Sequence, residues 1–326
     1  MILRRPLLAC AVALGLAAPA SAVTVTDHDI ARPEGPRHYL LVDPDDKAPG
    51  KRPLVILLHG HGASAAMMVG LASLGGYTSQ AWPALAAREH VLLLAPDGVK
   101  GSDGKNGWND CRLDAPTNTT VDDVGLIGAL IDTAVAQYGA DPARVYVYGM
   151  SHGGGMAYRA AIELAPRLAA VGVASGMMAA QNGCPAPSRP LPVFIAHGTA
   201  DEIVPYAGGK LGSWMLKGRG SAIGTEAAAD LWRTVAGLPA APATVRLPHL
   251  HPDDPTSATR VVWGSDPAGV QVELLRIDGG GHVEAARNGE LPWLLRKLVG
   301  AMNRDVDTVE EAWAFFKTRH NPGPPH

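Results

Sequence analysis

The stretch that most restricts how this chain can fold runs from Ala143 to Arg159. It opens with a β-branched and aromatic run, 145–148, typical of a buried strand, and ends in small and helix-favouring residues, 156–164. Between them lies Gly149-Met150-Ser151-His152-Gly153, which fits the G-x-S-x-G pattern of a tight strand-to-helix turn. Such a turn exposes the serine hydroxyl beyond the end of the sheet. The pattern therefore predicts a nucleophilic serine, and a glycine-rich turn with an ordinary surface serine is the competing interpretation.

The rest of the chain alternates between short apolar runs and segments with helical spacing. Strands are predicted at 38–42, 54–58, 91–95, 170–174, 193–196 and 271–277, and helices at 80–89, 122–138, 225–235, 291–302 and 308–319. This alternation indicates an α/β protein with a mostly parallel central sheet and helices on both faces. Ligands of such sheets bind at the carboxyl ends of the strands, where the turn around Ser151 is expected.

The first 22 residues have the pattern of a secretory signal peptide. Arg4 and Arg5 precede an apolar core, and Ala20-Ser21-Ala22 forms a small-residue cleavage site. The residues around Cys10 faintly resemble a lipoprotein cleavage site, which is the weaker alternative. We therefore expect a secreted or periplasmic protein with a signal peptide at 1–22 and a single catalytic domain at 23–326. No stretch approaches ~18 uninterrupted apolar residues, so no membrane span is expected.

The net charge and the cysteine content bear on the binding partners and on disulfide formation. The net charge of −3 and the absence of a basic run give no reason to expect nucleic-acid binding. Removal of the signal peptide leaves Cys111 and Cys184 as the two cysteines of the mature chain. An isolated pair in an oxidising compartment predicts a disulfide between them.

A second glycine-rich turn follows the predicted strand 54–58. It reads His59-Gly60-His61-Gly62, and a turn of this kind can point backbone N–H groups towards the serine. The oxyanion donors are therefore predicted to be the backbone N–H groups of His61 (or Gly62) and His152. A metal site on His59 and His61 is the alternative, but no carboxylate or cysteine lies near in sequence, so neither a metal nor another cofactor is expected.

An acid and a base are needed to activate the serine, and both follow predicted strands. Asp201 comes after the strand 193–196, and His282 follows three glycines after the strand 271–277. Asp201 as a simple turn residue remains the alternative for the acid, and His249 and His251 are rival bases. The order Ser151, Asp201, His282 is that of the α/β-hydrolases, and not that of chymotrypsin-like or subtilisin-like proteases.

With these motifs in place, the chain resembles the esterase/polyhydroxybutyrate-depolymerase family of secreted α/β-hydrolases. The resemblance extends over nearly the whole mature chain and rests on segments 57–60, 108–111, 122–127, 149–153, 197–206, 279–282 and 311–316. It implies Ser151, Asp201 and His282 as a catalytic triad, and it supports the Cys111–Cys184 bridge. The implied reaction is hydrolysis of carboxylic esters in hydroxyalkanoates, or of feruloyl or acetyl groups on plant polysaccharides.

The chain departs from this family in one motif. Many relatives follow the catalytic histidine with x-Trp-Pro-Gly, whereas this chain has Val283-Glu284-Ala285-Ala286. No separate adsorption domain is expected before His326, which favours soluble oligomers or small esters as substrates. Possible substrate-binding aromatics are Trp108, Tyr206 and Trp214, and no protein partner is implied. A prolyl oligopeptidase-like peptidase and a non-catalytic secreted binding protein remain alternatives.

Overall fold

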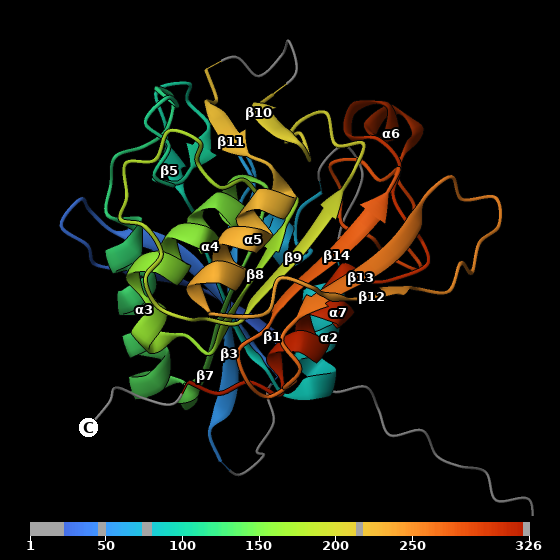
Figure 1. The fold of residues 1–326 in the computed structure, drawn as a ribbon. Coiled ribbons are helices and arrows are strands. Elements are labelled where there is room, and N and C mark those ends of the chain that lie inside the picture. Colours follow the sequence, from blue (N-terminus) through green and yellow to red (C-terminus); the bar gives the residue numbers. More distant parts are fainter. Residues whose placement is uncertain (1–22, 45–49, 74–79, 213–217, 322–326) are drawn as a thin grey trace, which may run out of the picture.

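The computed structural model describes residues 23–44, 50–73, 80–212 and 218–321. Its centre is a ten-stranded sheet in the order β1-β2-β4-β3-β7-β8-β9-β14-β13-β12 (Figure 1). Neighbouring strands from β4 to β14 run parallel, and two further antiparallel strands lie at each edge. The strands span Thr24–Ile30 (β1), Arg37–Asp43 (β2), Arg52–Leu58 (β3), Leu92–Pro96 (β4), Ala140–Met150 (β7), Ala170–Ala174 (β8), Val193–Gly198 (β9), Ala243–Arg246 (β12), Ser257–Trp263 (β13) and Val272–Asp278 (β14).

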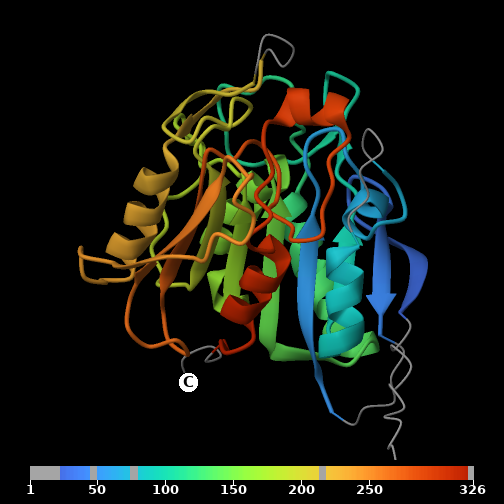
Figure 2. The same cartoon turned by 90° about the vertical axis from the view of Figure 1, so that its right-hand side faces the viewer.

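Helices cover both faces of this sheet, and each face has its own apolar layer. One layer includes buried residues of α3 (Asp123–Gln137), α4 (His152–Glu163) and α5 (Thr225–Val235). The other layer includes α2 (Ala81–Glu89) and α7 (Thr308–Phe316), which lie across the strands in Figure 2. The remaining helices are α1 (Ala65–Met68), the 3-10 turn η1 (Ala165–Arg167) and α6 (Trp293–Val299). The predicted α/β-hydrolase fold is confirmed by this arrangement.

The parallel strands agree with the apolar runs in the sequence, and the differences lie at the edges. The strand predicted at 170–174 and the helix predicted at 225–235 match β8 and α5. The helix predicted at 291–302 was too long, because α6 ends at Val299 and Gly300 takes φ 89°. The edge strands β1, β12 and β13 were not predicted, since their polar and apolar residues do not form a continuous buried run.

Smaller elements lie beyond the carboxyl ends of the central strands. The hairpins β5–β6 (Val99–Lys100 with Asn106–Gly107) and β10–β11 (Gly208–Lys210 with Ser221–Ile223) occupy the upper part of Figure 1, together with α6. These elements surround the turn that carries Ser151. Within the described ranges, every helix is too short or too polar to cross a bilayer.

The turn between β7 and α4 has the strained geometry that its glycines predict. Ser151 adopts φ 57° and ψ −119°, a conformation that non-glycine residues rarely take. A Cβ on Gly149 would lie 2.0 Å from the carbonyl oxygen of Gly153, and one on Gly153 would lie 2.0 Å from that of Leu58. Both clashes involve backbone atoms, so no side-chain movement can relieve them. The turn therefore requires glycine on both sides of the serine.

We expect Gly153→Ala to lower the free energy of unfolding by roughly 3 kcal/mol, because the added methyl group has no space between α4 and β3. Gly128→Ala is the matched control. Gly128 lies inside α3, and the nearest atom to its added Cβ is the flexible Arg167 guanidinium at 3.4 Å. Alanine there should raise stability by about 0.5–1 kcal/mol through its helix preference. Urea denaturation measures both effects, and equal stability of the two variants would contradict the proposed packing.

Candidate active site

The structure brings Ser151, His282 and Asp201 together at the carboxyl ends of the parallel strands. Ser151 follows β7, Asp201 lies just after β9, and His282 lies just after β14. The His282 Nε2 atom is 2.9 Å from the Ser151 Oγ, and its Nδ1 is 2.7 Å from the Asp201 Oδ2. All three side chains are buried. The hydroxyl, the imidazole and the carboxylate thus form a continuous hydrogen-bonded chain.

The carboxylate of Asp201 is held in its ionised form. Burial alone raises the pKa of Asp201, but the adjacent His282 and hydrogen bonds from two histidines lower it well below its usual range. Its Oδ1 also accepts hydrogen bonds from the backbone N–H groups of Ile203 (2.9 Å) and Val204 (2.8 Å). An ionised Asp201 accepts the Nδ1 proton of His282, which leaves Nε2 free to accept the serine proton.

A second histidine, His197, also contacts the Asp201 carboxylate. It is buried at the end of β9, and its Nε2 lies 3.2 Å from Asp201 Oδ2 and 3.0 Å from the carbonyl oxygen of Val204. Its Nδ1 pairs with the Thr225 hydroxyl at 2.7 Å. His197 is the first residue of the segment 197–206, and no role was predicted for it. Its spacing of four residues before Asp201 was the available signal.

Two backbone N–H groups near Ser151 have no acceptor in the described chain, namely those of His61 and His152. The N–H of Gly62, the alternative donor, is bonded to the carbonyl oxygen of Asn106 at 2.8 Å. The loop carrying His61 passes close to the serine, since a Cβ on Gly60 would lie 3.3 Å from that of Ser151. His152 is the first residue of α4, where the helix dipole adds partial positive charge. Both amides are therefore free to bind an oxyanion.

The three aromatic residues predicted to bind substrate, Trp108, Tyr206 and Trp214, do not share one environment. Trp108 is fully buried, its indole N–H donates to the carbonyl oxygen of His59 at 2.8 Å, and it packs on the His59 ring. Trp108 thus supports the loop before His61. Tyr206 is partly buried and lies edge-on to the His197 ring. Trp214 lies outside the described residues.

The histidines considered as rivals have separate partners. His249 bonds to Asp305 at 2.8 Å, away from Ser151 and its partners, and His251 is its neighbour on the same loop. His59 Nε2 accepts from the N–H of Gly98 at 2.9 Å, whereas His61 Nε2 lies 3.0 Å from Asp103. The rings of His59 and His61 are therefore engaged with different groups.

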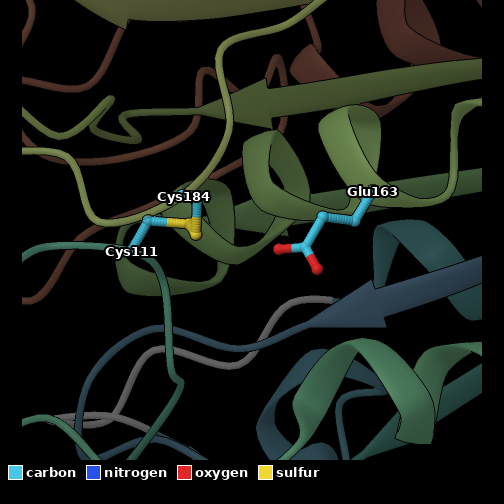
Figure 3. Close-up of side chains that lie close together, drawn as sticks. All are labelled: Cys111, Glu163 and Cys184. Carbon is cyan, nitrogen blue, oxygen red and sulfur yellow. A yellow bond between two sulfur atoms is a disulfide. The ribbon is translucent and has the colours of Figure 1, made fainter.

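The predicted disulfide is present between Cys111 and Cys184, whose Cα atoms are 5.3 Å apart (Figure 3). It links the loop after β6 to the segment between β8 and β9. Glu163 lies beside the two sulfur atoms and pairs with Arg159 at 2.6 Å. Because both sulfurs are joined to each other, this group of three residues offers no thiolate to a metal ion.

The departure after His282 places an acidic side chain against the core. Glu284 accepts a hydrogen bond from the Tyr148 hydroxyl. Burial raises the pKa of Glu284 to about 7, the Tyr148 hydrogen bond opposes this shift, and the nearby Asp307 adds to it. Glu284 is therefore a partly buried acid that joins the His282 loop to β7, three residues before the serine.

The fold and the clustered Ser151, His282 and Asp201 side chains define an esterase of the α/β-hydrolase class. The chain belongs to the phospholipase/carboxylesterase family, whose model matches residues 41–221. NocK of Nocardia uniformis subsp. tsuyamanensis, which carries an esterase designation, is 27% identical over 91% of this chain and 84% of its own.

Further similar proteins are named as feruloyl or acetyl xylan esterases. Feruloyl esterase C of Emericella nidulans is 31% identical over 53% of this chain, which spans 58% of that protein. The acetyl xylan esterase from Aspergillus awamori has the same fold, with a TM-score of 0.56 at 14% identity over 90% of this chain and 99% of that one.

The raised pKa of the partly buried Glu284 predicts a pH-dependent contribution to stability. Its pKa is higher in the folded chain than in the unfolded chain, so folding favours the protonated form. The contribution of Glu284 to the free energy of unfolding is therefore fully present below about pH 4.5, and it is lost as the pH rises to about 7. The free energy of unfolding should fall between pH 5 and pH 8 in the wild type. In Glu284→Gln we expect this fall to be smaller by about 1–3 kcal/mol. Urea denaturation at the two pH values measures this, and identical losses in both proteins would contradict it.

Proposed function

We propose that this protein is a secreted or periplasmic serine carboxylic-ester hydrolase that acts through Ser151, His282 and Asp201. The observation that carries the proposal is the chain of contacts from Ser151 Oγ through both ring nitrogens of His282 to Asp201. A buried histidine between a hydroxyl and an ionised carboxylate is the arrangement that activates a serine for attack on a carbonyl carbon.

The reaction proceeds in two halves. His282 takes the Ser151 proton as the hydroxyl oxygen attacks the ester carbonyl, and Asp201 stabilises the imidazolium that forms. The same proton then passes to the leaving alcohol, and the acyl group remains on the serine. A water molecule then loses a proton to His282 and attacks the acyl-enzyme. His282 returns this proton to the Ser151 oxygen as the carboxylic acid is released.

The developing negative charge is bound by the backbone N–H groups of His61 and His152. Both belong to turns that approach Ser151, and neither amide has another acceptor in the described chain. Their position at a glycine turn and at a helix N-terminus places donors near the oxyanion before the reaction starts, so little reorganisation is needed.

For the substrate, we propose soluble hydroxyalkanoate oligomers or small esters, in line with the polyhydroxybutyrate-depolymerase resemblance. Feruloyl or acetylxylan groups of plant polysaccharide are the second candidate. The names of the feruloyl esterases of Emericella nidulans and Piromyces equi favour it, although the alignments span 58% and 36% of those proteins.

Ser151→Ala should reduce the hydrolysis of p-nitrophenyl acetate by about 10⁵-fold or more, because no other group can form the acyl-enzyme. His282→Ala is expected to have a similar effect. Thr318→Ala, whose hydroxyl bonds to Pro267 far from the site, serves as the control and should retain full turnover. Ester hydrolysis that survives in Ser151→Ala would contradict the proposed nucleophile. Cleavage of a peptide anilide without ester turnover would favour the peptidase alternative, and no turnover in the wild type would favour a binding protein.

A substrate panel separates the two candidates. We expect the wild type to hydrolyse hydroxybutyrate dimers and trimers with a kcat/KM at least tenfold above that for methyl ferulate or acetylated xylan. Product release measured by liquid chromatography gives the ratio. A kcat/KM for methyl ferulate or acetylated xylan that exceeds that for the oligomers would reverse the order of the candidates.

A further inference from the structure

We propose that Arg219 is a positioning residue of the oxyanion hole, acting through the side chains of His152 and His61. Arg219 lies outside every motif recognised in the sequence, just before β11. This inference rests on the proposed function, because it concerns how the two proposed oxyanion donors are held.

The first contact fixes the ring of His152. The Arg219 Nη2 atom lies 3.1 Å from His152 Nδ1, and both side chains are buried. A guanidinium can only donate, so Nδ1 must accept and the ring proton must reside on Nε2. That Nε2 faces Asp110 Oδ2 at 3.4 Å. The imidazole next to the nucleophile is therefore held between a cation and an anion, in one tautomer.

The Asp110 side of this contact is itself rigid. Arg112 pairs with the Asp110 carboxylate at 2.8 Å, and the Asn118 amide donates to it at 2.6 Å. Arg112 also donates to the backbone carbonyl of Arg219. Burial raises the pKa of Asp110, but the neighbouring Arg112 and His152 lower it well below its usual range. The disulfide at the adjacent Cys111 restrains this segment. The two groups that contact the His152 ring, Asp110 and Arg219, are therefore both held by further contacts.

The second contact reaches the other oxyanion residue. The Arg219 Nη1 atom donates to the Thr117 hydroxyl at 2.9 Å and lies 3.7 Å from Asp103 Oδ2. The same Asp103 oxygen is 3.0 Å from His61 Nε2. Arg219 therefore connects to His152 directly and to His61 through one carboxylate. The rings of His61 and His152 also lie near each other, with centroids 5.9 Å apart.

The charges around the site support this role. Burial lowers the pKa of His152 and of His61 to about 4, so both rings are neutral at neutral pH. Burial also lowers the pKa of Arg219, to about 10, which leaves its guanidinium charged. Arg112 is already paired with Asp110, whereas Arg219 acts on the pKa of both neutral rings. Its fork geometry, with separate donors to His152 and to Thr117, cannot be reproduced by lysine.

The test compares Arg219→Met with Arg319→Met, a matched control. Arg319 is also a buried arginine, but it lies over the Phe315 ring and bonds to Gln271, in the core layer of α7. Turnover of p-nitrophenyl acetate is measured per active site, after titration of the reactive serine with a fluorophosphonate probe. We expect Arg219→Met to lower kcat by about 10–100-fold with KM within threefold, because it weakens the oxyanion donors. Arg319→Met should lower stability and leave kcat per active site unchanged.

A tetrahedral inhibitor gives a readout that a merely structural role would not move. A short alkyl boronic acid bonds to the serine oxygen and places a boron-bound oxygen in the oxyanion hole. Its Ki should rise in Arg219→Met by the same factor by which kcat/KM falls. Arg219→Lys, which keeps the charge but loses the fork, should show a smaller loss of kcat, of about threefold or more, with a parallel change in Ki.

Each outcome bears on the inference. Unchanged kcat and Ki in Arg219→Met, or equal losses in Arg319→Met, would overturn it. If Arg219→Met does not fold, Arg219→Lys decides, and its unchanged kcat and Ki would equally overturn the inference. Ester turnover that persists in Ser151→Ala would refute the proposed function itself, whereas an inactive Ser151→Ala with a fully active Arg219→Met would refute only the role of Arg219.

Discussion

The strained backbone at Ser151 is the constraint around which the rest of the site is arranged. Its φ of 57° is maintained because β7 and α4 are both buried and held by neighbouring elements, so the turn between them cannot relax. The same turn starts a helix directly after the serine and leaves the His152 amide without an acceptor among the residues that the structure describes. One local conformation thus supplies both an outward hydroxyl and an amide hydrogen beside it.

Two buried carboxylates organise the polar groups on the two sides of this serine. Asp201 holds His282 on one side, and Asp110 faces His152 on the other. Both have pKa values below their usual range despite burial, since each receives several hydrogen bonds and faces a cation or a histidine. The difference lies in the histidines: His282 contacts the serine oxygen itself, whereas the ring of His152 faces away from it towards Arg219. This asymmetry separates the proposed base from the proposed oxyanion residue.

The loop after His282 is bonded to two neighbouring elements. Glu284 accepts a hydrogen bond from Tyr148 on β7. The backbone of His282 is also bonded to Val299 at the end of α6. The proposed base is therefore held by elements on both sides.

The sequence by itself determined the parallel strands, the turn at Ser151 and the three residues that the structure brings together. Continuous apolar runs such as Leu54–Leu58 report burial on both faces of a sheet, and a glycine pair around a serine has few other uses. The three glycines that follow the strand 271–277 favoured His282 over His249, which lies in a proline-rich, acidic segment. The strands β1, β12 and β13 were missed because none forms a continuous buried run, and β12 is exposed along its whole length. The end of α6 was misplaced because apolar residues continue beyond Gly300.

Only the tertiary structure decided the contacts between residues far apart in the chain. Arg219 is one arginine among many in the sequence, and its position beside His152 depends on how the β10–β11 hairpin packs over the disulfide-linked loop. The choice of His61 over Gly62 depended on a hydrogen bond to Asn106, which no local pattern indicates. Such contacts follow from the packing of loops at the rim of the sheet, where apolar periodicity is absent and partners are set by three-dimensional distance.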